Sequence, residues 1–131
     1  MKRNYLKITL FLFILLNLSG CATLYNPATE RNEFILISSA TEKAIGKGAA
    51  AEYTKEYPLA QDQYLQARIR RVGERISKVS DRQDIEYQFS VVDNKELNAL
   101  TLPGGYIYVN SGLMDVLNDD ELAFVLAHEA G

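Results

Sequence analysis

Two adjacent residues near the end of the chain, His128 and Glu129, are of the types that bind zinc and activate water. With Ala130 and Gly131 they form the first four residues of an H-E-x-x-H pattern. In that pattern two histidines one helical turn apart bind zinc, and the glutamate takes a proton from the zinc-bound water. The second histidine would follow Gly131, and His128 is the only histidine in the chain. One imidazole cannot hold a catalytic zinc, so the pattern indicates zinc-dependent hydrolysis with an incomplete metal site. A histidine at a helix end beside a solvated glutamate is the alternative for the pair taken alone.

This chemistry requires the His-Glu pair to lie on a helix, and the preceding residues predict one. Asn118 followed by Glu121 matches a capping box, which marks a helix start. Leu122, Val125 and Leu126 follow at helical spacing and form an apolar stripe. We expect a helix that begins near Asn118 and carries the pair at its end.

Three short strands are predicted ahead of this helix. Apolar and polar residues alternate between residues 86 and 92, which is typical of a half-buried strand. Residues 100–102 and 106–109 predict two further strands, joined through Pro103-Gly104-Gly105. With the helices around them, these strands predict an α+β fold in which helices pack around a small, mainly antiparallel sheet.

Two helices are predicted before the strands. Ser39 and Glu42 match a capping box and Pro58 provides a stop, so the first helix is expected over residues 40–57. The apolar face of the second helix contains Leu65, Ile69, Val72, Ile76 and Val79. The spacings between these residues are those of one helix face.

The charge pattern argues against a nucleic-acid partner. The net charge is −3, and three of the 14 basic residues lie in the first seven positions. The second predicted helix carries Arg68, Arg70, Arg71, Arg75 and Lys78, interrupted by Glu74. We interpret these residues as a solvated helix surface, largely off the apolar face. An acidic chain without a dense basic face is a poor nucleic-acid binder.

The first twenty residues have the layout of a secretory signal peptide. Lys2 and Arg3 precede an apolar run at residues 8–16, which is too short for a comfortable membrane span. Residues 18–21, with the sequence LSGC, resemble the lipobox of bacterial lipoproteins. The resemblance implies that residues 1–20 are removed and that Cys21 is lipidated. A short anchor helix with an idle cysteine is the alternative. Residues 21–38 are then expected to be a lipidated tether, and residues 39–131 an incomplete metallopeptidase domain.

A longer segment resembles a known family. The sequence NALTLPGGYIYVNSGL at residues 98–113, with the His-Glu helix after it, resembles the envelope branch of the gluzincin peptidases. That branch includes the membrane protease HtpX, the CAAX prenyl endopeptidases and periplasmic lipoproteins. Residues 44–47, 53–57 and 71–76 also resemble its lipoprotein members. Leu100 and Thr101 stand where the family often has Phe and Ala or Cys.

The resemblance implies a zincin-like fold and a Zn²⁺ cofactor, with His128 as a zinc ligand and Glu129 as the general base. It also implies that substrate is held as an added strand at the sheet edge near the metal. Residues 106–109, or the strand before them, are the expected edge; the alternative is that Tyr106 and Tyr108 only pack a sheet face. Unfolded or misassembled envelope proteins are the implied substrates.

The resemblance also implies a location. The protein would be anchored in the bacterial cell envelope by its N-terminal lipid and would face the periplasm. Ala22, rather than an aspartate, follows the lipidation site, which implies the outer membrane. We expect the sequence to be the N-terminal portion of a zinc-dependent endopeptidase, cut inside its motif. A non-catalytic lipid-anchored binding protein, or a truncated and inactive protease, is the alternative.

Overall fold

The computed structural model describes residues 23–26, 31–34 and 38–131. The predicted signal peptide and Cys21 lie outside the described residues. Strands β1 (Thr23–Asn26) and β2 (Arg31–Phe34) pair antiparallel as a two-stranded ribbon, which we did not predict within the tether. All other elements belong to a second unit, Ile37–Gly131. None of the described helices is both long enough and apolar enough to cross a membrane.

The second unit contains four helices and three strands. In chain order they are α2 (Ser39–Glu56), α3 (Gln63–Ser77), β3 (Gln88–Val92), β4 (Ala99–Leu102), β5 (Tyr106–Asn110), α4 (Ser111–Val116) and α5 (Asp119–Ala130). Every helix and strand predicted from the sequence is present, with bounds within about two residues. The short helix α4 was not predicted, because its six residues are too few to show a helical period.

The three strands form a mixed sheet in the order β3-β5-β4. The β4–β5 pair is an antiparallel hairpin, as expected, but β3 pairs parallel to β5 on its other side. The α+β class is therefore confirmed, while the mainly antiparallel character is wrong for this sheet. The chain reverses direction between β3 and β4 and reverses again at the tight turn between β4 and β5. Strand β5 therefore runs antiparallel to β4 and parallel to β3.

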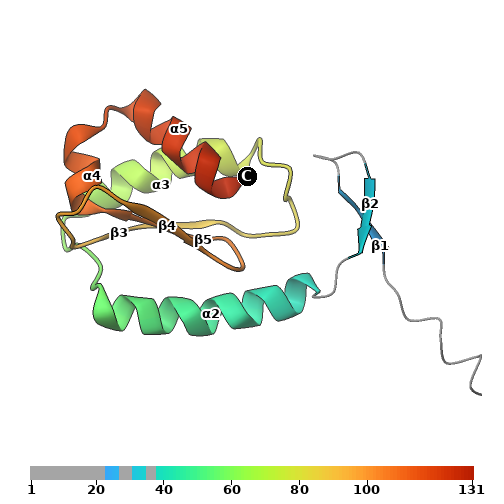
Figure 1. The fold of residues 1–131 in the computed structure, drawn as a ribbon. Helices are drawn as coiled ribbons and strands as arrows, with labels where there is room; N and C mark the ends of the chain where they lie inside the picture. Colours follow the sequence, from blue (N-terminus) through green and yellow to red (C-terminus); the bar gives the residue numbers. More distant parts are fainter. Residues whose placement is uncertain (1–22, 27–30, 35–37) are drawn as a thin grey trace, which may run out of the picture. The chain divides into compact units, whose positions relative to one another are not determined.

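Helices cover both faces of the sheet (Figure 1). Helices α3 and α5 lie on one face, where the main core contains Ile69, Val72, Phe89, Val91, Ile107, Val109, Met114, Leu122 and Leu126. Helix α2 lies on the other face, where Ala50 packs with Val92 and Tyr108. Burial along β3 alternates as predicted from Gln88 to Val91, and only its last residue, Val92, is also buried on the α2 side.

The turn between β4 and β5 requires its glycines. Gly104 and Gly105 have φ of 77° and 88°, in the left-handed region that favours glycine. The turn also packs tightly against α2. A Cβ placed on Gly46 would lie 1.8 Å from the Pro103 carbonyl oxygen, so only a glycine allows this approach.

The start of α2 differs from the prediction by one residue. Ser38, not Ser39, is the N-cap, and its side chain accepts a hydrogen bond from the Thr41 amide. Ser39 instead donates to Asp84, at 2.6 Å. Glu42 accepts from the Gly104 amide at 3.2 Å, so its carboxylate joins α2 to the turn of the hairpin and does not close a capping box.

The surface assigned to α3 needs two corrections. Val79 was placed on the apolar face, but α3 ends at Ser77 and the Val79 side chain is 78% exposed. Arg68 was placed on the solvated surface, but it is only 8% exposed. Its burial follows from its position where α3 meets α4 and the start of α5.

Candidate active site

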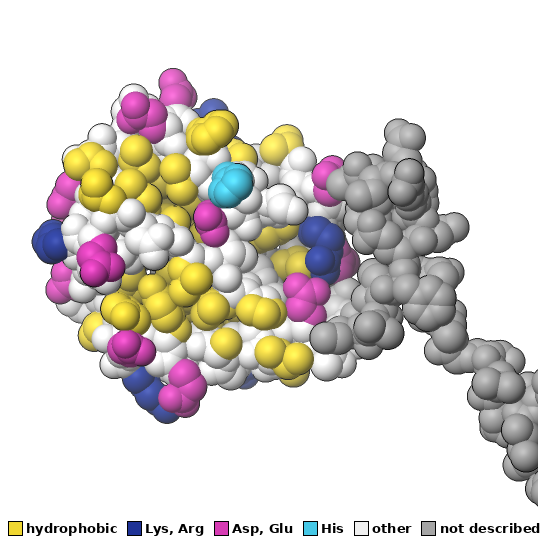
Figure 2. Space-filling model, in the orientation of Figure 1, with side chains coloured by type: hydrophobic (Ala, Val, Ile, Leu, Met, Phe, Trp, Pro, Cys, Tyr) yellow, Lys and Arg dark blue, Asp and Glu magenta, His cyan; other side chains and the backbone are white. Residues whose placement is uncertain are grey.

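The His-Glu pair lies in the last turn of α5. The capping box between Asn118 and Glu121 is present and starts the helix as predicted. Leu122 and Leu126 are fully buried and fix the rotation of the helix against the sheet. That rotation leaves His128 exposed and Glu129 partly buried. Figure 2 shows the chain's single histidine at the molecular surface, with hydrophobic side chains gathered beside it.

The strand nearest to this pair is β4, at the edge of the sheet. The Thr101 hydroxyl, on β4, lies 2.5 Å from Glu129 Oε2 and 3.1 Å from the Glu129 carbonyl oxygen. The sequence predicted residues 106–109 as the edge, or else the strand before them. The first choice is wrong, because β5 has β3 on one side and β4 on the other. The second choice, β4, is an edge strand.

A second hydroxyl holds the end of α5. The Tyr87 hydroxyl donates to the Ala130 carbonyl oxygen at 3.0 Å and is 2.8 Å from Ser80 Oγ. Thr101 and Tyr87 therefore hold the turn that carries the pair from two separate elements. Neither hydroxyl was predicted to have a role, because Thr101 and Tyr87 both lie far from the pair in sequence.

The other end of α5 is held by Arg68. Its guanidinium donates to Asp119 Oδ1 at 2.7 Å and to the carbonyl oxygens of Met114, at 2.9 Å, and Leu117. The hydrogen bonds from Arg68 and Arg71 hold the pKa of Asp119 below its usual range. Arg68 thus joins α3, the end of α4 and the first turn of α5.

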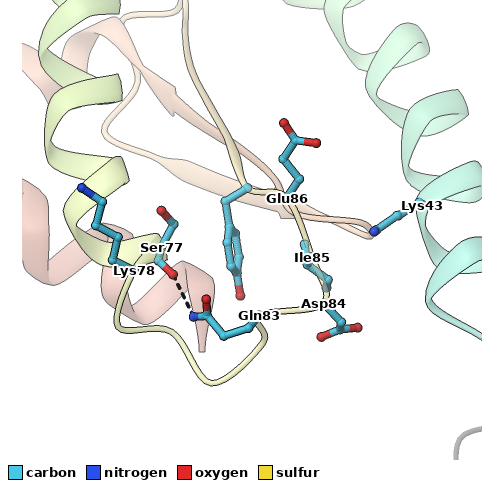
Figure 3. A pocket seen from close by; sticks show the side chains of 8 residues that line it. Lys43, Ser77, Lys78, Gln83, Asp84, Ile85 and Glu86 are labelled. Atoms are coloured by element: carbon cyan, nitrogen blue, oxygen red, sulfur yellow. Dashed lines mark hydrogen bonds between the residues drawn. The ribbon is translucent and has the colours of Figure 1, made fainter.

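A polar cavity of about 480 Å³ lies between the start of α2 and the end of α3. Figure 3 shows Lys43 on one side and Ser77 and Lys78 on the other, with the loop that carries Asp84 and Glu86 between them. Its charged groups are of both signs, and neither residue of the His-Glu pair lines it. The cavity is therefore separate from the candidate active site.

The described residues do not suffice to hold a catalytic metal. Among them, no three His, Cys, Asp or Glu side chains are grouped so that they could bind one ion. His128 supplies one nitrogen ligand, and a catalytic zinc takes about three protein ligands. The donor set in residues 38–131 thus fits part of a zinc site only.

A helix that carries a His-Glu pair beside the edge strand of a small sheet is the arrangement expected of a zincin-like metallopeptidase. Comparison with known proteins identifies the family. Residues 63–131, more than half of the chain, match the model of peptidase family M48. The chain belongs to this family, and the class of enzyme predicted from the sequence is confirmed at that level.

Three relatives illustrate the similarity. The chain is 33% identical over 112 residues to the mitochondrial metalloendopeptidase OMA1 of Schizosaccharomyces pombe, covering 80% of this chain and 32% of that protein. It is 29% identical over 100 residues to the metalloprotease YcaL of Escherichia coli, covering 72% and 37%. It is 32% identical over 89 residues to the beta-barrel assembly-enhancing protease of Yersinia pestis, covering 67% and 18%. The chain spans about a third of the first two relatives.

Proposed function

We propose that the protein acts as a zinc-dependent endopeptidase of the bacterial cell envelope, with unfolded or misassembled envelope proteins as substrates. The observation that carries this proposal is the His-Glu pair in the last turn of α5, held against the edge strand β4. His128 serves as one zinc ligand and Glu129 as the general base. The other zinc ligands come from residues outside 38–131.

The edge of the sheet supports a preference for unfolded substrates. Strand β4 pairs only with β5 among the described strands, so one side of its backbone has amide and carbonyl groups available for pairing. An extended peptide can bind such an edge as an added strand, with main-chain hydrogen bonds providing affinity. Unfolded proteins offer more free extended segments than folded ones, which favours them as substrates.

The envelope location rests on the N-terminal sequence and on the relatives. The lipobox at residues 18–21 supports a lipid on Cys21 and a periplasmic enzyme, and Ala22 supports the outer membrane. The name of the Yersinia pestis relative refers to β-barrel assembly, which supports a role in quality control of envelope proteins. Membrane fractionation tests this part, since Cys21→Ser should move the protein from the membrane fraction to the soluble one.

Activity is tested on the full-length protein, purified with its lipid in detergent. We expect it to cleave an unfolded, fluorescently labelled casein, to lose this activity with a zinc chelator and to regain it when zinc is added. Glu129→Gln should abolish cleavage with little change in zinc content, whereas His128→Ala should lower both. Zinc-independent cleavage, or full activity of Glu129→Gln, would contradict the proposal.

A second candidate function rests on the edge strand β4 alone. If the full-length protein binds no zinc and cleaves nothing, the edge of β4 still offers a site for extended peptides. The protein would then be a lipid-anchored binding protein. Retained binding of the labelled casein by the inactive protein would support this function.

A further inference from the structure

We infer that Thr101 is a positioning residue for the Glu129 carboxylate, an inference that rests on the proposed function. Its hydroxyl lies 2.5 Å from Glu129 Oε2, although the two residues are 28 positions apart in the chain. Thr101 belongs to the edge strand and Glu129 to the helix, so the contact links the two elements that form the candidate site.

The geometry favours the carboxylate as the acceptor. A hydroxyl has one proton to donate, and two acceptors lie near it: Oε2 at 2.5 Å and the Glu129 carbonyl oxygen at 3.1 Å. Bonds from a hydroxyl to an ionised carboxylate are about 2.5–2.7 Å long. The shorter distance falls in that range, and so the proton lies mainly toward Oε2.

The position of Thr101 in β4 directs its side chain toward α5. Side chains alternate along a strand, so Ala99 and Thr101 share one face. Ala99 packs against the core beneath α5, whereas Leu102 packs in the cluster beneath α2. Thr101 therefore faces α5, and its branched Cβ limits the side chain to few rotamers.

This contact holds one oxygen of the carboxylate and leaves the other available. Of the two carboxylate oxygens of Glu129, only Oε2 has a hydrogen-bond partner among the described residues. A base that accepts a proton through Oε1 is then held in one rotamer before substrate arrives. The consequence is a contribution to the rate of the chemical step and little contribution to substrate binding, because Thr101 acts through Glu129.

The experiment compares variants of the full-length protein by steady-state kinetics on the labelled casein. Thr101→Val removes the hydroxyl with little change in shape, and Thr101→Ser keeps it. Thr54→Val is the matched control, because within the described part of the chain the Thr54 hydroxyl bonds only to the carbonyl oxygens of Ala50 and Ala51 in α2. We expect Thr101→Val to lower kcat about tenfold with KM changed less than about twofold. Thr101→Ser should restore kcat to within about threefold, and Thr54→Val should leave it unchanged.

A second readout does not depend on activity. In a double-mutant cycle of thermal unfolding without metal, Thr101→Val should lower Tm less in a Glu129→Ala background than in the wild type. Additive shifts, or an unchanged kcat in Thr101→Val, would overturn the inference while leaving the proposed function intact. A wild-type protein that is inactive with zinc would overturn both, even if the cycle shows coupling.

Discussion

Replacement of Arg68 by methionine tests how α5, the helix that carries the His-Glu pair, is held at its start. Methionine retains the unbranched apolar stem of arginine and removes the guanidinium. In the wild type that group donates to the carbonyl oxygens of Met114 and Leu117 and to Asp119. The two carbonyl groups belong to the end of α4, where helical carbonyls lack partners within the helix. Arg68 is thus the cap of α4 as well as an ion-pair partner.

The magnitude follows from the groups left without partners. A buried acceptor that loses its only partner costs about 1–3 kcal/mol, and a half-buried one costs less. The bond to Met114 is buried and the bond to Leu117 is partly buried. We expect Arg68→Met to lower the free energy of unfolding by about 3 kcal/mol. No contribution is counted for Asp119, since solvent screens its exposed carboxylate.

The assay is urea unfolding of the full-length protein, followed by far-ultraviolet circular dichroism. Arg71→Met is the matched control, because Arg71 lies on the same helix and contacts the same Asp119, at 2.8 Å, but is exposed. Its effect should be much smaller. If the two variants lose equal stability, or if Arg68→Met loses less than about 1 kcal/mol, the burial of Arg68 does not carry the energy assigned to it.

Three further predictions concern other parts of the fold. Gly46→Ala should lower the free energy of unfolding by about 1–3 kcal/mol, because the new Cβ forces α2 away from the Pro103 carbonyl. Gly48→Ala places its Cβ in open space and should raise that free energy by about 0.5–1 kcal/mol. Equal shifts of Tm in the two variants would contradict the tight approach of α2 to the turn. Hydrogen bonds from Arg82 and then Ser39 hold the pKa of Asp84 well below its usual range. A lowered folded-state pKa contributes stability that is complete above about pH 4 and lost as the pH falls further. Asp84→Asn should therefore lose less stability than the wild type between about pH 4 and 2. Parallel plots of the urea midpoint against pH for the two proteins would refute this. Tyr87→Phe should cost about 1 kcal/mol and speed amide hydrogen exchange around Ala130, because it removes the hydrogen bond between Tyr87 and α5. Unchanged exchange there would argue against a stabilising role of this bond.

Local patterns predicted most of the elements correctly. The capping box at Asn118 started α5 where it was expected, because its hydrogen bonds join residues three apart in the chain. The glycines at 104 and 105 predicted the hairpin turn, since positive φ is a property of single residues. Patterns that span only one turn or one strand can be read from the sequence for this reason.

Contacts between distant residues were not predicted. Arg68 was assigned to the solvated surface because its helix pattern looks amphipathic, and only the packing of three helices shows it to be buried. The parallel pairing of β3 with β5 was missed for the same reason, as strand order depends on the path of the whole chain.

The sequence by itself predicted the His-Glu pair on a helix and the order of the longer helices and of strands β3, β4 and β5. His128 and Glu129, the helix that carries them and the strands before it all follow from residue types and spacing. Tertiary structure alone decided which strand forms the edge and which hydroxyl reaches the carboxylate. It places β4 outside β5 and brings Thr101 to Glu129 across 28 residues of chain. Periodic patterns indicate which face of a helix or strand is apolar, but tertiary packing determines which other element covers that face.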